Sequence, residues 1–129
     1  MQKLEGQSDL FLLVGRLFYS SLFLLYAYLK LTGYAGTVGY MTNLGLPSFF
    51  AIFAIIIELG GGILVLIGYQ MRLVALGLAI YVLIASLIAH RDFANGAQLL
   101  NFMKNMVIIG GSLAFVASGA GAYSMDGRK

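Results

Sequence analysis

Long apolar runs separated by short polar or charged segments dominate this chain. No charged residue lies between Lys30 and Glu58, and none lies between Arg72 and Arg91. A membrane-spanning helix needs about 20 consecutive apolar residues. The runs therefore predict four membrane-spanning helices, at about residues 10–30, 48–69, 72–90 and 99–121.

Turn and cap residues mark the ends of these spans. Pro47 suits the first turn of a helix, where its missing N–H leaves no hydrogen bond unmade. Residues 68–72 leave room only for a tight turn, and the polar segment 91–96 contains an Asn-Gly turn signal. Gly119 precedes a polar tail. With connections this short, we expect one all-α integral membrane domain, a four-helix bundle over residues 1–129.

The segment 31–46 differs from the spans because it is rich in glycine and polar residues. It is too polar to cross a bilayer, and tyrosine rings such as those of Tyr34 and Tyr40 favour the headgroup level. We therefore predict a short interfacial helix or a re-entrant segment between the first two spans, rather than a plain extracellular loop.

Composition agrees with a membrane protein. The chain of 129 residues is 60% hydrophobic and 10% charged, whereas soluble domains carry about 25% charged residues. This excludes a soluble globular enzyme and a disordered chain. The net charge is +3, but the eight basic residues are spread along the sequence, whereas a phosphate-binding face needs them clustered. We expect a lipid bilayer as partner and no nucleic acid.

The basic residues also predict an orientation. Four predicted spans place both termini and the 68–72 turn on one side, which carries Lys3, Arg72, Arg128 and Lys129. The opposite side carries Lys30 and Arg91. Since cytoplasmic loops are enriched in Lys and Arg, we expect cytoplasmic termini.

The residue inventory limits the chemistry. With no cysteine there is no disulfide, thiol relay or iron–sulfur cluster. One histidine and five carboxylates make a buried two-metal centre hard to assemble. We therefore expect no metal site and no intrinsic cofactor. Any electron carrier has to be a borrowed molecule such as a quinone, or a partner.

Three ionisable residues, Arg16, Glu58 and Lys104, fall inside the predicted spans. Each costs about 2.5–3.5 kcal/mol at a helix centre, so such residues face the bundle interior and find a partner. Glu58 is the one acid in the predicted spans available to either base. Two interpretations follow: a structural Arg16–Glu58 ion pair that fixes helix register, or a ligand, proton or quinone site around that pair.

Helical spacing gives each span a stripe of polar or small residues, and the four stripes can converge around Glu58. The candidate ligand-binding site consists of Arg16, Lys30, Glu58, His90, Asn101, Lys104 and Asn105. Small residues let membrane helices approach closely. The residues expected to serve helix packing are Gly60, Gly61, Gly62, Gly110 and Gly111. Tyr19 and Tyr81 are predicted to be core residues.

Several motifs in order along the chain carry a resemblance to a known family. They include Lys30-Leu31-Thr32-Gly33-Tyr34, Leu44-Gly45-Leu46-Pro47, Glu58-Leu59-Gly60-Gly61-Gly62 and Asn101-Phe102-Met103-Lys104-Asn105. On these residues the sequence resembles the DoxX family of small bacterial membrane proteins, especially its YqjF-type members. The resemblance covers nearly the whole chain. It implies four spans with both ends on one side, in a bacterial inner membrane.

The resemblance implies two functions. Related members are linked to thiosulfate:quinone oxidoreductase subunits and other membrane oxidoreductase assemblies, which suggests a subunit that binds a quinone or a similar hydrophobic ligand at the buried polar site. Distant eukaryotic relatives act as cargo receptors or assembly chaperones, which suggests a non-enzymatic adaptor that stabilises or assembles a partner complex. The glycine-rich faces also permit a homodimer. The sequence leaves open whether the chain is an enzyme.

Overall fold

The computed structural model describes residues 7–89 and 94–128. These residues form five α-helices and a 3-10 turn, with no strand among them: α2 (Ser8–Thr32), α3 (Tyr34–Asn43), α4 (Phe49–Ile67), α5 (Met71–Ala89), α6 (Gly96–Ser118) and η1 (Asp126–Arg128). Helices α2, α4, α5 and α6 are long and apolar enough to cross a membrane. The prediction of an all-helical protein with four spans is confirmed, with helix ends shifted by one to three residues.

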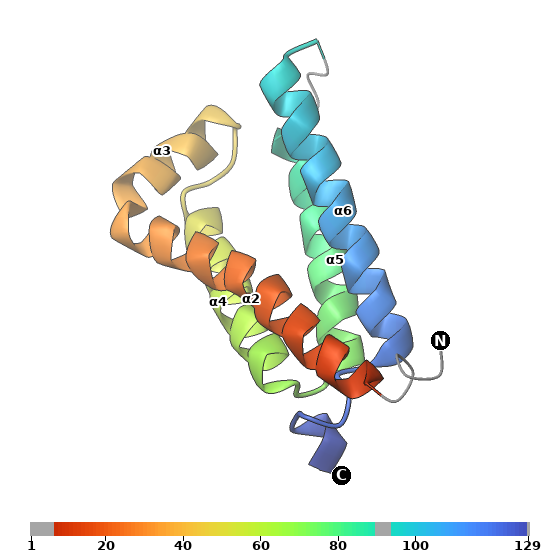
Figure 1. Ribbon diagram of the computed structural model, residues 1–129. Helices are drawn as coiled ribbons and strands as arrows, with labels where there is room; N and C mark the ends of the chain where they lie inside the picture. The colour runs from red at the N-terminus through yellow and green to blue at the C-terminus, as the bar shows by residue number, and fades with distance from the viewer. Residues whose placement is uncertain (1–6, 90–93, 129) are drawn as a thin grey trace.

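The predicted short helix between the first two spans is α3, which has ten residues. It follows α2 directly after Gly33, whose N–H donates to the carbonyl of Leu29 at the end of α2. None of its residues is buried. Figure 1 shows α3 at the end of the molecule that lies away from η1.

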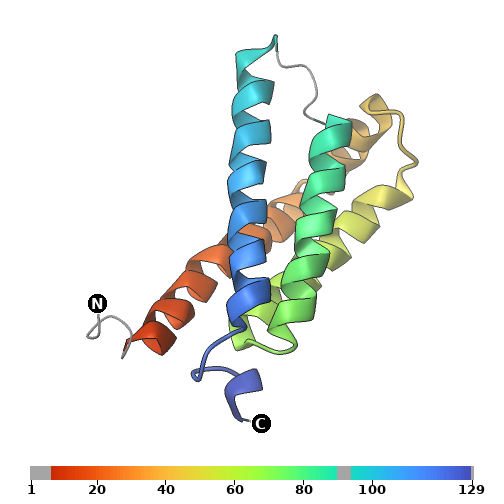
Figure 2. The same ribbon diagram turned by 90° about the vertical axis from the view of Figure 1, so that its right-hand side faces the viewer.

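The four long helices form two pairs. Helix α2 packs along α4, α5 packs along α6, and fewer contacts join α4 to α5. The two pairs lie close together near the start of α2 and η1, and they diverge towards α3 (Figures 1 and 2). We call the first region, with residues 119–128, the closed end. The region formed by α3 and the adjoining ends of the long helices is the open end.

Small and apolar side chains fill the contacts between the helices. The buried core includes Phe23 of α2, Val65 of α4 and Leu78 of α5. Large apolar side chains point outward instead, and Phe18 and Val107 are 75% and 74% exposed. This distribution suits helices that are surrounded by lipid, because lipid chains are as apolar as the side chains they contact.

Two of the five glycines predicted to serve helix packing lie at close helix contacts. A Cβ built on Gly61 would lie 2.8 Å from the side chain of Leu78, and one on Gly62 would lie 2.8 Å from that of Leu24. Helices α5 and α2 can therefore approach α4 only because these residues lack a side chain. A Cβ on the other three, Gly60, Gly110 and Gly111, would meet no atom within 4 Å. Those three glycines do not lie at a close contact between the described helices, and their role in helix packing stays a prediction.

Candidate functional site

Arg16 does not pair with Glu58 as predicted. Its side chain is 1% exposed and bonds to backbone carbonyls at the closed end. Nη1 donates to the oxygen of Ala120 at 3.1 Å, and Nη2 donates to those of Tyr123 at 2.9 Å and Leu66 at 3.4 Å. Helices α2 and α4 run antiparallel, so Arg16 lies level with the end of α4. Leu66 is eight residues, or about 12 Å along the helix, beyond Glu58.

The tail after α6 folds back beneath the helices and supplies these carbonyls. Gly119 and Gly121 have φ of +76° and +86°, which glycine adopts without strain and which turn the chain back. The two carboxylate oxygens of Asp126 then accept the backbone N–H groups of Gln70 and Met71, each at 2.8 Å. A carboxylate satisfies the unpaired N–H groups at a helix start. The tail therefore ties the start of α5 to the end of α6.

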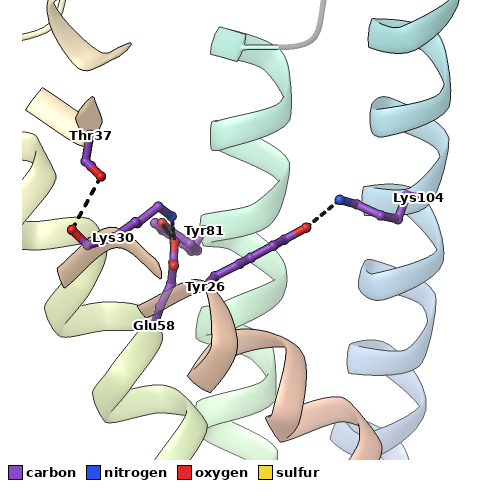
Figure 3. Close-up of polar contacts among 6 residues, drawn as sticks. All are labelled: Tyr26, Lys30, Thr37, Glu58, Tyr81 and Lys104. Carbon is purple, nitrogen blue, oxygen red and sulfur yellow. Dashed lines mark hydrogen bonds and ion pairs between the residues drawn. The ribbon is translucent and has the colours of Figure 1, made fainter. Parts of the chain in front are cut away.

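Glu58 instead lies at the centre of a polar cluster towards the open end (Figure 3). Its side chain is 3% exposed. Oε2 accepts hydrogen bonds from the ammonium group of Lys30 and from the hydroxyl group of Tyr81. Oε1 is buried and has no hydrogen-bond partner among the described residues. The intramembrane carboxylate is thus paired with the base at the end of α2, in place of the expected pair with Arg16.

Lys104 lies opposite this cluster, on α6. Its ammonium group donates to the hydroxyl of Tyr26 and lies 5.2 Å from the centroid of that ring. The ammonium of Lys30 lies 5.7 Å from the same centroid. Because the Lys104 ammonium bonds to the hydroxyl, it lies beyond the edge of the Tyr26 ring and not over its face, so the contact between the two helix pairs is a hydrogen bond. The next residue of α6, Asn105, donates from Nδ2 to Ser86 Oγ at 2.8 Å.

These side chains line one cavity of about 750 Å³, to which all five helices contribute. Lys30, Glu58, Asn101, Lys104 and Asn105 all line it, and most of the remaining lining is apolar. The structure therefore brings these five predicted site residues around one space. Arg16 lies at the closed end, away from this space. His90, also a predicted site residue, lies outside the described residues.

Two tyrosines of the cluster were not among the predicted site residues. Tyr81 was expected in the core, yet its hydroxyl bonds to Glu58. Tyr26 bonds to Lys104 across the cavity. Tyr26 precedes Lys30 by four residues, so the two share a helix face, and this spacing is a signal in the sequence that could have identified Tyr26. No comparable spacing links Tyr81 to Glu58, which is on a different helix.

Four apolar helices, with a cluster of polar side chains in the cavity between them, define a small helical integral membrane protein. The family model for DoxX matches residues 11–91, more than half of the chain. The chain belongs to the DoxX family. It is 42% identical over 126 residues to the Inner membrane protein YqjF of Escherichia coli (strain K12), a match covering 98% of this chain and 95% of that protein.

A second relative is the Inner membrane protein YphA of the same organism. It is 34% identical over 124 residues, which cover 91% of this chain and 89% of that protein. No solved structure matches the chain. The DoxX match spans α2 to α5 and includes Lys30, Glu58 and Tyr81, whereas Lys104 on α6 lies beyond it.

Proposed function

We propose that this protein binds a quinone or a similar hydrophobic ligand in the open-end cavity, as a subunit of a membrane oxidoreductase system. We place it in a bacterial inner membrane with both termini in the cytoplasm. The names of the two relatives support that membrane. The start of α2 and η1 both lie at the closed end (Figure 1), and the excess of Lys and Arg near the termini supports the orientation.

The observation that carries the proposal is the cavity itself. Its volume of about 750 Å³ falls within the 300–1,000 Å³ typical of small-molecule sites. Such sites are mostly apolar with a few polar groups that fix the orientation of the ligand. Here the apolar part includes Phe50 and Phe53 of α4, and the polar groups face the same space from α2, α4 and α6.

The residues present fit a quinone ring. A quinone is flat and apolar, and its two carbonyl oxygens accept hydrogen bonds. Lys104 supplies ammonium donors and Asn101 an amide donor, both on the α6 side of the cavity. The apolar lining suits an isoprenoid tail. A bound quinone would supply two-electron chemistry, while the chain would bind the ring, orient it and exclude water.

The paired Lys30 and Glu58 add a second argument. Two ionised groups at this depth cost several kcal/mol even when they are paired, and intramembrane ionisable residues mark ligand, ion or proton pathways. The cluster also includes Tyr81, which places an exchangeable proton beside the carboxylate. A pair that only joined α2 to α4 would not need to line a cavity, yet both residues do.

The first experiment asks whether the purified protein carries a quinone. Extraction of protein purified in mild detergent, followed by mass spectrometry, should recover a quinone in near-stoichiometric amount. Added short-chain quinone analogues should bind in calorimetry. Glu58→Gln should fold and weaken that binding, because it removes the carboxylate that holds Lys30 in place.

A matched pair of variants locates the site. Ala85 of α5 lines the cavity, so Ala85→Phe should fill it and weaken analogue binding about tenfold or more, equivalent to ~1.4 kcal/mol. Val107 is 74% exposed on α6 and does not line the cavity, so Val107→Phe should bind as wild type does. Absence of quinone and of analogue binding, or unchanged binding by Ala85→Phe, would contradict the proposal and favour the adaptor function.

A further inference from the structure

We propose that the open-end cavity takes an acidic amphiphile, whose anionic head group is held by the Lys104 ammonium and the Tyr26 hydroxyl. The head group is a carboxylate, an ionised hydroxyl or a phosphodiester, and the apolar body of the molecule lies among the cavity's side chains. This rests on the proposed function and names the chemistry of the ligand that the same cavity binds.

The charges around the cavity do not balance. Of the described residues that line it, Lys30 and Lys104 are cations and Glu58 is an acid. Glu58 forms its ion pair with Lys30, and Lys104 forms no ion pair within the described part of the chain. The other described acids, Asp9 and Asp126, bond to backbone N–H groups at the closed end. One positive charge is left on the α6 side of the cavity.

The position of Lys104 makes this charge significant. The residue lies eight positions into α6, about 12 Å from the start of the helix. A lysine near a helix end usually extends its ammonium group to the membrane surface. Here the ammonium crosses instead towards α2 and bonds to the neutral phenol of Tyr26 (Figure 3). Lys104 forms no ion pair with a described residue, and an anion bound beside its ammonium group supplies that partner.

Tyr26 provides a second donor at the same place. Its hydroxyl oxygen accepts from Lys104, and within residues 7–89 and 94–128 its hydroxyl hydrogen has no acceptor. Asn101, three residues before Lys104 on α6, also lines the cavity. Adjacent ammonium and phenol donors suit an anionic oxygen, because hydrogen bonds to a charged acceptor are about twice as strong as neutral ones.

The test compares two probes of similar size and shape, one anionic and one neutral. One is a hydroxynaphthoquinone with an alkyl chain, used at a pH where its hydroxyl is ionised, and the other is the methylnaphthoquinone with the same chain. Calorimetry on the full-length protein in mild detergent should give about tenfold or more tighter binding of the anion. Lys104→Gln should abolish that preference, and Lys104→Arg should retain most of it, because arginine keeps the charge.

Leu100→Gln is the matched control. Leu100 is 72% exposed on the same helix and does not line the cavity, so the added amide should leave the preference intact. Equal binding of the two probes by wild type, or an anion preference that persists in Lys104→Gln, overturns this inference and leaves the proposed function standing. Binding of neither probe overturns both.

Competition then separates the sources of the anion. Displacement of the anionic probe by dodecanoate, but not by phosphatidylglycerol in nanodiscs, assigns the site to a single-chain acid. Displacement by phosphatidylglycerol, but not by phosphatidylcholine, assigns it to an acidic lipid head group. Both results support an anion site. Equal displacement by dodecanol and dodecanoate counts against it.

Discussion

The two ends of the helical bundle use charged residues differently. At the closed end, Arg16, Asp9 and Asp126 bond to backbone groups of a folded tail and of the helix ends. At the open end, Lys30 and Lys104 bond to other side chains around a cavity. Backbone acceptors are fixed once the chain folds, whereas side chains can change partner when a ligand binds. Charged side chains therefore bond to fixed backbone groups at the closed end and to movable side chains at the open end.

The packing of the helices follows the same division. At the closed end, Met71 and Ala75 of α5 and Val65 of α4 are fully buried. At the open end, no residue of α3 is buried, and the two helix pairs have separated. Thr37 of α3 donates to the backbone carbonyl of Lys30 at 3.5 Å, which places the short helix directly beside the polar cluster (Figure 3).

The largest expected effect tests the closed end. Arg16→Met keeps an unbranched side chain but leaves the carbonyls of Ala120 and Tyr123 without their donor. Since a buried acceptor that loses its partner costs ~1–3 kcal/mol, the free energy of unfolding should fall by roughly 3 kcal/mol in total. Unfolding in a denaturing detergent, followed by circular dichroism, measures it.

The counterpart at the open end is Lys104→Gln. Lys104 is exposed and bonds to another side chain, so its removal should change the free energy of unfolding by less than about 1 kcal/mol. If Arg16→Met and Lys104→Gln destabilise the protein equally, the contrast between the two ends is wrong.

A smaller effect tests the contact between α2 and α4 that lies between the two ends. Gly62→Ala places a methyl group against the side chain of Leu24, and should destabilise the protein by about 2 kcal/mol through overpacking. Gly60 on the same helix faces open space. Gly60→Ala should therefore be neutral or stabilising by up to ~1 kcal/mol, the difference in helix propensity. Thermal unfolding of both variants measures these changes in stability. A similar loss of stability in each variant would argue against a close approach of the helices at Gly62.

The smallest of the three expected losses tests the tail. Asp126→Asn keeps the shape of the side chain but removes the charge beside the start of α5 and one of its two acceptors. We expect a loss of about 1 kcal/mol, typical of a helix cap. Hydrogen exchange should also quicken at the Gln70 and Met71 amides and remain slow in the middle of α5. Unchanged exchange at these two amides would show that the tail does not hold the start of α5.

The sequence predicted the site residues better than it predicted their pairing. Lys30, Glu58 and Lys104 were expected around one polar site, and each lines the cavity. Burying a charge in a membrane is costly wherever the partner lies, so polar residues within apolar runs indicate an interior site. Whether Arg16 or Lys30 pairs with Glu58 depends on which turn of α2 lies beside the middle of α4. The position of α2 along α4 follows from the way the two helices cross and from the tail that binds Arg16.

Span number and span position were determined by the sequence alone, because each depends on the length of an apolar run relative to the bilayer. The short helix after the first span followed from a segment that is too polar to cross the bilayer and carries tyrosines. The tertiary structure decided the rest. In it, Arg16 bonds to a tail about 100 residues away in the chain, and Tyr26 and Tyr81 join the polar cluster. Lys104 lies beside the cavity and forms no ion pair with a described carboxylate. These contacts join different helices, and no local pattern of residues specifies the distance between two helices once they pack.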